Sequence, residues 1–267
     1  MVEIREETPS EQNNTNSDNA STSNRSSVPP RQSVMEYLKA DPSNAFLCIL
    51  RIATVFFSIL YLLPSRDNGT YYNKAMIAAA VTNGIRLSQR LGGNFQLTRE
   101  FITNAVLEDS FHYLVYSLIF AVSTPMTMAL VPVSLFGLLH SINYINKVAQ
   151  NTGHGNNGII VKAHTLVNQQ TDNLLGIVAT GEIFMFPILF GLIFTGKGTI
   201  FLPIVYYKFL CFRYSSRRNP YTRIAFGQMK TSLTQASLSP KCPTIASSFI
   251  HKAIAFVERL APQTVSA

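Results

Sequence analysis

The sequence is short of charge: aspartate, glutamate, lysine and arginine fill 13% of its 267 positions, about half the usual share of a globular domain. Hydrophobic residues fill 47%, and the few charges avoid long stretches of the chain. This combination excludes an ordinary soluble protein of one or two domains. It indicates an all-α integral membrane protein, because a helix satisfies its backbone hydrogen bonds without water.

Cysteine and chemical motifs are also scarce. The three cysteines, Cys48, Cys211 and Cys242, form no C-x-x-C pair, so the sequence offers no disulfide framework and no cysteine zinc site. It contains no nucleotide-binding loop, no H-E-x-x-H motif and no nucleophile elbow. We therefore expect no enzymatic activity, no cofactor, no metal and no nucleic-acid partner.

Three pairs of apolar segments organise the chain. Residues 1–33 are rich in serine, asparagine, threonine and glutamate, so we expect them to be disordered. No early apolar run ends in a small-residue cleavage site, and the first membrane segment should therefore act as its own signal. The expected membrane domain, residues 34–214, is polytopic and holds three helical hairpins with short turns, at 45–87, 105–142 and 174–212.

The distribution of basic residues predicts the topology. The short turns hold three lysines or arginines, whereas the opposite connections hold five, and the basic tail lies on that side too. Because cytosolic loops carry the excess of such residues, we expect cytosolic termini and lumenal turns. The first segment, Ala45–Leu63, is long enough to cross a bilayer, but the second, fourth and sixth are short or interrupted. Full spans and hairpins that enter mainly the cytosolic leaflet both remain open.

The C-terminal tail, residues 215–267, is expected to be cytosolic and basic. From Lys208 onward the chain has nine basic residues and one acid, which accounts for its whole net charge of +8. Apolar residues recur at helical spacing in two stretches, so we predict two amphipathic helices that lie on an anionic membrane surface. A stop-transfer signal that only sets topology is compatible with this. The predicted lipid-binding residues are Arg213, Arg217, Arg218, Arg223, Lys230, Phe249, Lys252, Phe256 and Arg259.

Several ionisable residues lie within the apolar segments. Glu182 is deep in the fifth segment, where a carboxylate needs a partner, a proton or a water-filled cavity. Arg51 and Arg86 are the cations available to it. At the head of the third segment, Glu108 and His112 are spaced to share one helix face. We predict a polar network that joins the hairpins, made of Arg51, Glu108, Asp109, His112 and Glu182.

Two motifs carry a family resemblance. LEDSFHYLVYSLIF (107–120) and FRYSSRRNPYTR (212–223) resemble the transmembrane protein 33 family, called Krüppel homologue 2 in insects. Fungal members are membrane proteins associated with nuclear pores and the endoplasmic reticulum. Shorter matches are RLSQRL at 86–91, EIF at 182–184 and ERLAP at 258–262. The resemblance covers roughly residues 44–262.

The resemblance implies a function that the residues alone do not reveal. It implies residence in the endoplasmic reticulum and nuclear envelope, association with reticulon-type proteins and nuclear pore components, and tuning of the unfolded-protein response. No enzymatic activity is attached to the family. We therefore expect a multi-pass protein that organises membrane shape and partner proteins. The alternative is an ion or small-molecule transporter or channel built around Glu182, Glu108 and Asp109.

Overall fold

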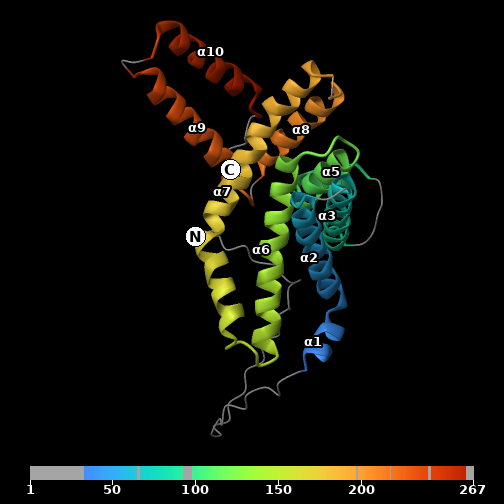
Figure 1. Ribbon diagram of the computed structural model, residues 1–267. Coiled ribbons are helices and arrows are strands. Elements are labelled where there is room, and N and C mark those ends of the chain that lie inside the picture. The colour runs from blue at the N-terminus through green and yellow to red at the C-terminus, as the bar shows by residue number, and fades with distance from the viewer. Residues whose placement is uncertain are drawn as a thin grey trace, which may run out of the picture. The chain divides into compact units, whose positions relative to one another are not determined.

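Figure 1 shows the computed structural model. It describes residues 33–64, 67–92, 98–196, 198–216, 218–239 and 242–262. All ten elements in these residues are α-helices, and the described part contains no strand, which confirms the all-α prediction. The prediction of disorder falls on residues 1–32, which lie outside the described part, and on Ser33.

The first predicted pair is a hairpin of α2 (Pro42–Leu62) and α3 (Asn68–Arg90), preceded by the short α1 (Val34–Ala40). Proline at the first position and the carboxylate of Asp41, which accepts a hydrogen bond from the Asn44 backbone N–H at 3.2 Å, begin α2. The third helix begins earlier than the predicted segment because Tyr72 is fully buried, with its ring 5.5 Å from that of Tyr61.

The sequence predicts one helix for the third apolar segment, but the structure contains two. α4 (Arg99–Leu107) ends, Glu108 is extended, and α5 (Asp109–Ala121) begins. An acid in the first turn of α5 is favourable because the helix N-terminus carries partial positive charge. With 13 residues, α5 is about 20 Å long and shorter than a bilayer core of about 30 Å.

The two longest helices are α6 (Thr127–Asn151) and α7 (Gly158–Phe194). The fourth segment is neither short nor ended by its proline, because α6 continues through Pro132 and through polar residues predicted to lie in a connection. Gly153, with a φ of +81°, lies in the turn that follows α6. Among the described residues, α2, α6 and α7 are long and apolar enough to cross a membrane.

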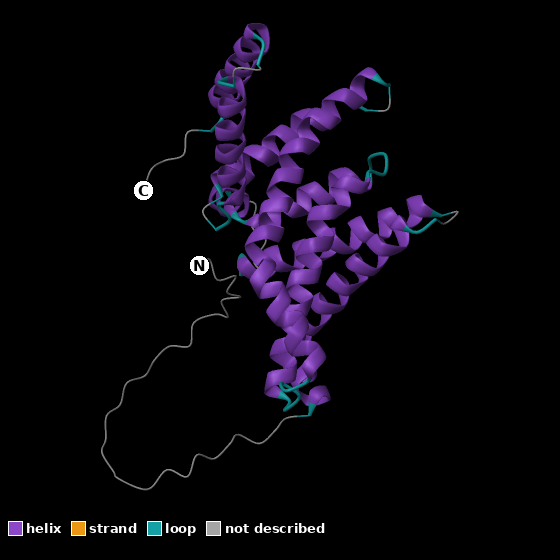
Figure 2. Cartoon of the chain, turned by 60° about the vertical axis from the view of Figure 1, so that its left-hand side comes forward, coloured by secondary structure: helices purple, strands orange, loops and turns teal. Residues whose placement is uncertain are grey.

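The chain ends with α8 (Phe201–Ser215), α9 (Tyr221–Ser237) and α10 (Thr244–Leu260). Three helix pairs end in tips on one side of the described unit and spread apart there (Figure 2). The two helices of the second pair, α5 and α6, contact each other little. α5 packs on α3 and α8, whereas α6 packs on α2 and α7. An aromatic core fills the space between α3, α5 and α8, and its largest members are Tyr72, Tyr113, Tyr116, Phe120, Tyr206 and Phe209.

Candidate functional site

The centre of the site is a buried ion pair between α7 and α8. Glu182 is 1% exposed, and its Oε2 accepts a hydrogen bond from Nε of Arg213 at 3.2 Å. Its Oε1 accepts one from the Tyr113 hydroxyl on α5. Arg213 is equally buried, and its guanidinium carbon lies 4.9 Å from the centroid of the Tyr113 ring. Three helices therefore meet around two opposite charges that are removed from solvent.

A second carboxylate ties the end of α8 to the start of α5. Asp109 Oδ1 lies 3.5 Å from a terminal guanidinium nitrogen of Arg213 and accepts a hydrogen bond from the Ser216 hydroxyl at 2.9 Å. The same hydroxyl oxygen accepts a hydrogen bond from the Asn219 backbone N–H at 3.2 Å. Asp109 lies at the start of α5 and Arg213 at the end of α8, the helix ends that favour an acid and a base respectively. The link toward α9 is therefore fixed to α5.

Glu108 extends the cluster to the protein surface. Its Oε2 lies 2.6 Å from Arg90, in the last turn of α3, and 3.0 Å from Arg218, in the link between α8 and α9. These arginine side chains are 33% and 58% exposed. Exposed ion pairs contribute little to stability, so we expect the buried pair to dominate the energetics of the cluster.

The structure brings four of the five predicted network residues together, around a cation that the sequence reasoning assigned elsewhere. Arg51 and Arg86 were the predicted partners of Glu182, whereas its partner in the structure is Arg213. Arg51 lies instead at the contact of α2 with α6, where its carbonyl oxygen would be 3.2 Å from a Cβ added at Gly137. The sequence could have indicated that Arg213 is buried, because it continues the helical spacing of apolar residues in α8. The buried residues Leu202, Tyr206, Phe209 and Arg213 are spaced four, three and four apart.

His112 stabilises the break between α4 and α5. Its Nε2 lies 2.6 Å from the Val106 carbonyl oxygen, its Nδ1 lies 3.7 Å from Asp109, and its ring stacks on Phe212 at 5.4 Å. Among the described residues, no group of three or more histidine, cysteine, aspartate or glutamate side chains is placed to hold a metal ion. The cluster holds helix ends together by charge and hydrogen bonds.

The basic motif at the start of the tail is partly buried. Arg213 was predicted to contact lipid, but it is 1% exposed and paired with Glu182, so it presents no free cation to a membrane surface. Arg218 is exposed and paired with Glu108. Arg217 lies outside the described residues. Arg213 and Arg218 therefore contribute to contacts between helices.

The first tail helix packs on protein. Ala225 of α9 is buried against Ala179 and Ile183 of α7, with Phe226 and Met229 beside it. The Tyr221 hydroxyl donates a hydrogen bond to Asp172, also on α7. Burial, followed by this hydrogen bond, raises the pKa of Tyr221 to about 12. The prediction that both tail helices lie on the bilayer is not met by α9, because α7 offers it an apolar surface.

The second tail helix leaves its apolar face open. No residue of α10 is buried, and Ile245, Phe249 and Phe256 are 84%, 72% and 62% exposed. Lys252 and Arg259 are also exposed, and each follows a phenylalanine by three residues, so they flank the apolar row. The opposite side of α10 contacts α9, through the exposed Lys230–Glu258 ion pair and a 3.3 Å contact between Ser237 and His251. Arg223, on α9, is partly buried.

Comparison with known proteins identifies the family of the chain. Residues 26–263 match the family described as transmembrane protein 33/nucleoporin POM33. A Caenorhabditis elegans transmembrane protein 33 homolog is 43% identical over 234 residues, 86% of each chain. Human transmembrane protein 33 is 37% identical over 88% of this chain and 96% of its own. Drosophila melanogaster Krueppel homolog 2 is 35% identical over 86% and 83%. No solved structure matches the chain significantly. The chain therefore belongs to the transmembrane protein 33/nucleoporin POM33 family.

Proposed function

We propose that this protein organises membrane shape and partner proteins in the endoplasmic reticulum and nuclear envelope. Its family and its three long apolar helices make it a multi-pass membrane protein. The location and the shaping role go beyond that, and they rest on the family resemblance together with two physical features of the molecule. Those features are the exposed face of α10 and the short helices α5 and α8.

The face of α10 is the observation that carries the proposal. Phe249 and Phe256 project from a helix with no buried residue, beside Lys252 and Arg259. Each basic residue near an anionic leaflet contributes about 1 kcal/mol, and each large apolar side chain contributes at most about 1.5–3 kcal/mol when fully buried. The two contributions are comparable, so the helix should need both anionic headgroups and a lipid interior.

The short helices α5 and α8 support a wedge in one leaflet. α5 and α8 have 13 and 15 residues and are about 20 Å long, so neither reaches across a bilayer core of about 30 Å. Both belong to pairs whose tips spread apart (Figure 2). Helices that fill more of one leaflet than of the other favour a curved membrane. This is the shape expected of a protein that stabilises tubules or the rim of a pore.

Partner proteins are proposed from the family. Nucleoporin POM33 gives the family part of its description, which supports association with the nuclear pore. Reticulon-type partners and tuning of the unfolded-protein response rest on the resemblance alone. Proximity labelling from the C-terminus in intact cells tests this part, and we expect pore components and tubule-shaping proteins among the labelled neighbours. Labelling no richer in them than that of an unrelated membrane protein of the endoplasmic reticulum would reject it.

Membrane binding by α10 can be measured with a peptide of residues 243–262. We expect it to be unstructured in water and helical on vesicles that contain anionic lipid, by circular dichroism and vesicle co-sedimentation. The double substitution Phe249→Glu and Phe256→Glu should abolish binding, and high salt should weaken it, since a Debye length is about 10 Å at 0.1 M salt.

A matched control separates the apolar face from net charge. Ser248→Glu with His251→Glu adds the same two negative charges to exposed positions outside the apolar row, so this peptide should still bind, though more weakly. Equal binding of the original peptide to neutral and anionic vesicles would refute the electrostatic part of the proposal. Equal loss in both double variants would refute the apolar part.

A transporter built around Glu182 is the alternative, and the geometry favours the structural role. The Glu182 carboxylate is buried against Arg213 and Tyr113 rather than exposed to a water-filled path. Replacing both members of the ion pair with leucine tests this. A structural pair predicts a protein that still localises and shapes membranes, whereas a transport pathway predicts a folded protein that has lost its function.

A further inference from the structure

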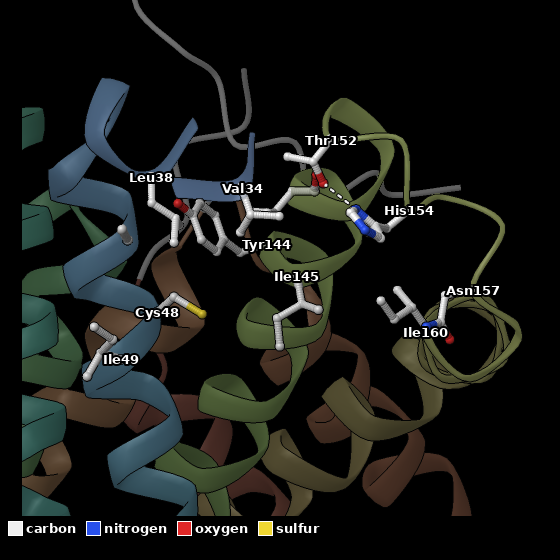
Figure 3. A pocket seen from close by; sticks show the side chains of 13 residues that line it. Val34, Leu38, Cys48, Ile49, Tyr144, Ile145, Thr152, His154, Asn157 and Ile160 are labelled. Carbon is white, nitrogen blue, oxygen red and sulfur yellow. Dashed lines mark hydrogen bonds between the residues drawn. The ribbon is translucent and has the colours of Figure 1, made fainter. Parts of the chain in front are cut away.

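A cavity of about 380 Å³ lies between α1, α2, α6 and the start of α7 (Figure 3). It is separate from the ion-pair cluster. Its floor is apolar and includes Cys48 and Ile49 from α2 and Ile145 and Val148 from α6. The lining residues lie near the beginning of α2 and the end of α6, so the cavity is remote from the three tips.

One end of the cavity is polar. Thr152, His154 and Asn157, from the turn between α6 and α7, line this rim (Figure 3). The Thr152 hydroxyl lies 3.3 Å from Nδ1 of His154, and His154 and Asn157 are exposed. An apolar floor that ends in an exposed polar rim suits a molecule with a hydrocarbon chain and a polar head.

The apolar floor is continuous with the outer surface of a membrane helix. Ile49, which lines the cavity, is 63% exposed, and Phe46, one turn earlier on α2, is 50% exposed. Both belong to one of the three helices that are long and apolar enough to cross a membrane. A hydrocarbon chain can therefore enter sideways from the leaflet that surrounds the beginning of α2.

The form of the cavity argues for a hydrocarbon chain, because its apolar floor opens along the exposed face of α2 and ends at a polar rim. We propose that the cavity binds one acyl chain of a phospholipid from the adjacent leaflet, with the headgroup at the rim of Thr152, His154 and Asn157. This site is independent of the membrane binding proposed for α10.

Photo-crosslinking of the full-length protein tests the site. The protein is reconstituted into vesicles of phosphatidylcholine that carries a photoactivatable group on one acyl chain, and the adducts are mapped by mass spectrometry. We expect adducts at Cys48, inside the cavity. Val148→Phe should lower them about tenfold, the change expected when about two methylene groups no longer fit. The matched control Leu138→Phe, at a 37% exposed position of α6 outside the cavity, should leave them unchanged.

A second variant and two contrary results complete the test. Ile145→Phe fills the same cavity from a position that is 39% exposed, so it serves if Val148→Phe fails to fold. Unchanged Cys48 adducts in a folded cavity-filled variant, or equal labelling of Cys48 and the outward Ile52, would mean only annular lipid contact and would overturn the proposal. A rise in adducts after removal of residues 1–31 would assign the cavity to the chain's own N-terminal segment and would also overturn it.

Discussion

The two tail helices have the same length and similar patterns, yet they have different surroundings. α9 and α10 each have 17 residues, with apolar side chains at helical spacing. The buried side chains of α9 are small, namely Thr222, Ala225 and Ser237, whereas α10 buries none. Ala225 lets α9 approach α7 closely, with Phe226 and Met229 beside it, while the phenylalanines of α10 remain exposed next to Lys252 and Arg259. The apolar period alone therefore does not separate the face that packs on α7 from the face that stays exposed.

The basic residues of the tail divide in the same way. Just before and at the beginning of the tail, Arg213 and Arg218 are held by Glu182 and Glu108, so they tie it to α7 and α5. At its end, Lys252 and Arg259 are exposed beside apolar side chains. The basic residues of this part of the sequence therefore fall into two groups, one in ion pairs between helices and one exposed on α10. Substitutions can separate the effects of the two groups.

The largest effect is expected at the buried ion pair. Arg213→Leu leaves Glu182 charged and buried, which should destabilise the protein by about 3–5 kcal/mol. The matched substitution at the far end of the tail, Arg259→Leu, should change stability by less than about 0.5 kcal/mol. Thermal unfolding in detergent measures both. The double substitution Arg213→Leu and Glu182→Leu should recover much of the loss, and no recovery would argue against the pairing.

One substitution, made in both helices, compares their packing. Ala225→Phe introduces a ring where α9 meets α7 and should cost about 1–3 kcal/mol, with faster hydrogen exchange throughout α9. Ala253→Phe enlarges an exposed residue on α10 and should leave stability unchanged while strengthening binding to anionic vesicles. If the two variants destabilise the protein equally, both helices pack on protein and the comparison is wrong.

A smaller effect is expected at the first residue of α9. Tyr221→Phe removes the hydrogen bond to Asp172 and should cost about 1 kcal/mol, seen as faster hydrogen exchange in the first turns of α9 with no change in α10. Asp172→Asn, which keeps an acceptor, should cost less. Unchanged exchange in the Tyr221 variant would show that apolar contacts alone hold α9.

The smallest effect is expected where the two helices touch. Lys230 and Glu258 form an ion pair with side chains 57% and 53% exposed, and such pairs contribute about 0–1 kcal/mol. Lys230→Ala should therefore leave the unfolding temperature nearly unchanged at 150 mM salt. A marked destabilisation would indicate that α10 depends on α9 and does not present an independent face.

Much of the fold could be read from residue patterns. Apolar runs predicted part of every long helix, and the tail helices were predicted from their spacing. The end of α6 and the first half of α7 were missed, because residues 143–172 are polar and were predicted to be a connection. The break before α5 could not be read in this way, because LEDSFHYL has a continuous helical pattern. It arises where His112 contacts the Val106 carbonyl and Asp109 meets Arg213. Such contacts override local propensity when they satisfy buried polar groups.

The sequence by itself determined that this chain is an all-α membrane protein with a basic tail, because composition and period depend only on neighbouring residues. Tertiary structure alone decided that Glu182 pairs with Arg213, 31 positions later, and with Tyr113, 69 positions earlier. It also decided that α9 lies on α7 while α10 does not. Local pattern cannot choose between equivalent cations or apolar surfaces, since that choice is made by the close packing of side chains from distant segments.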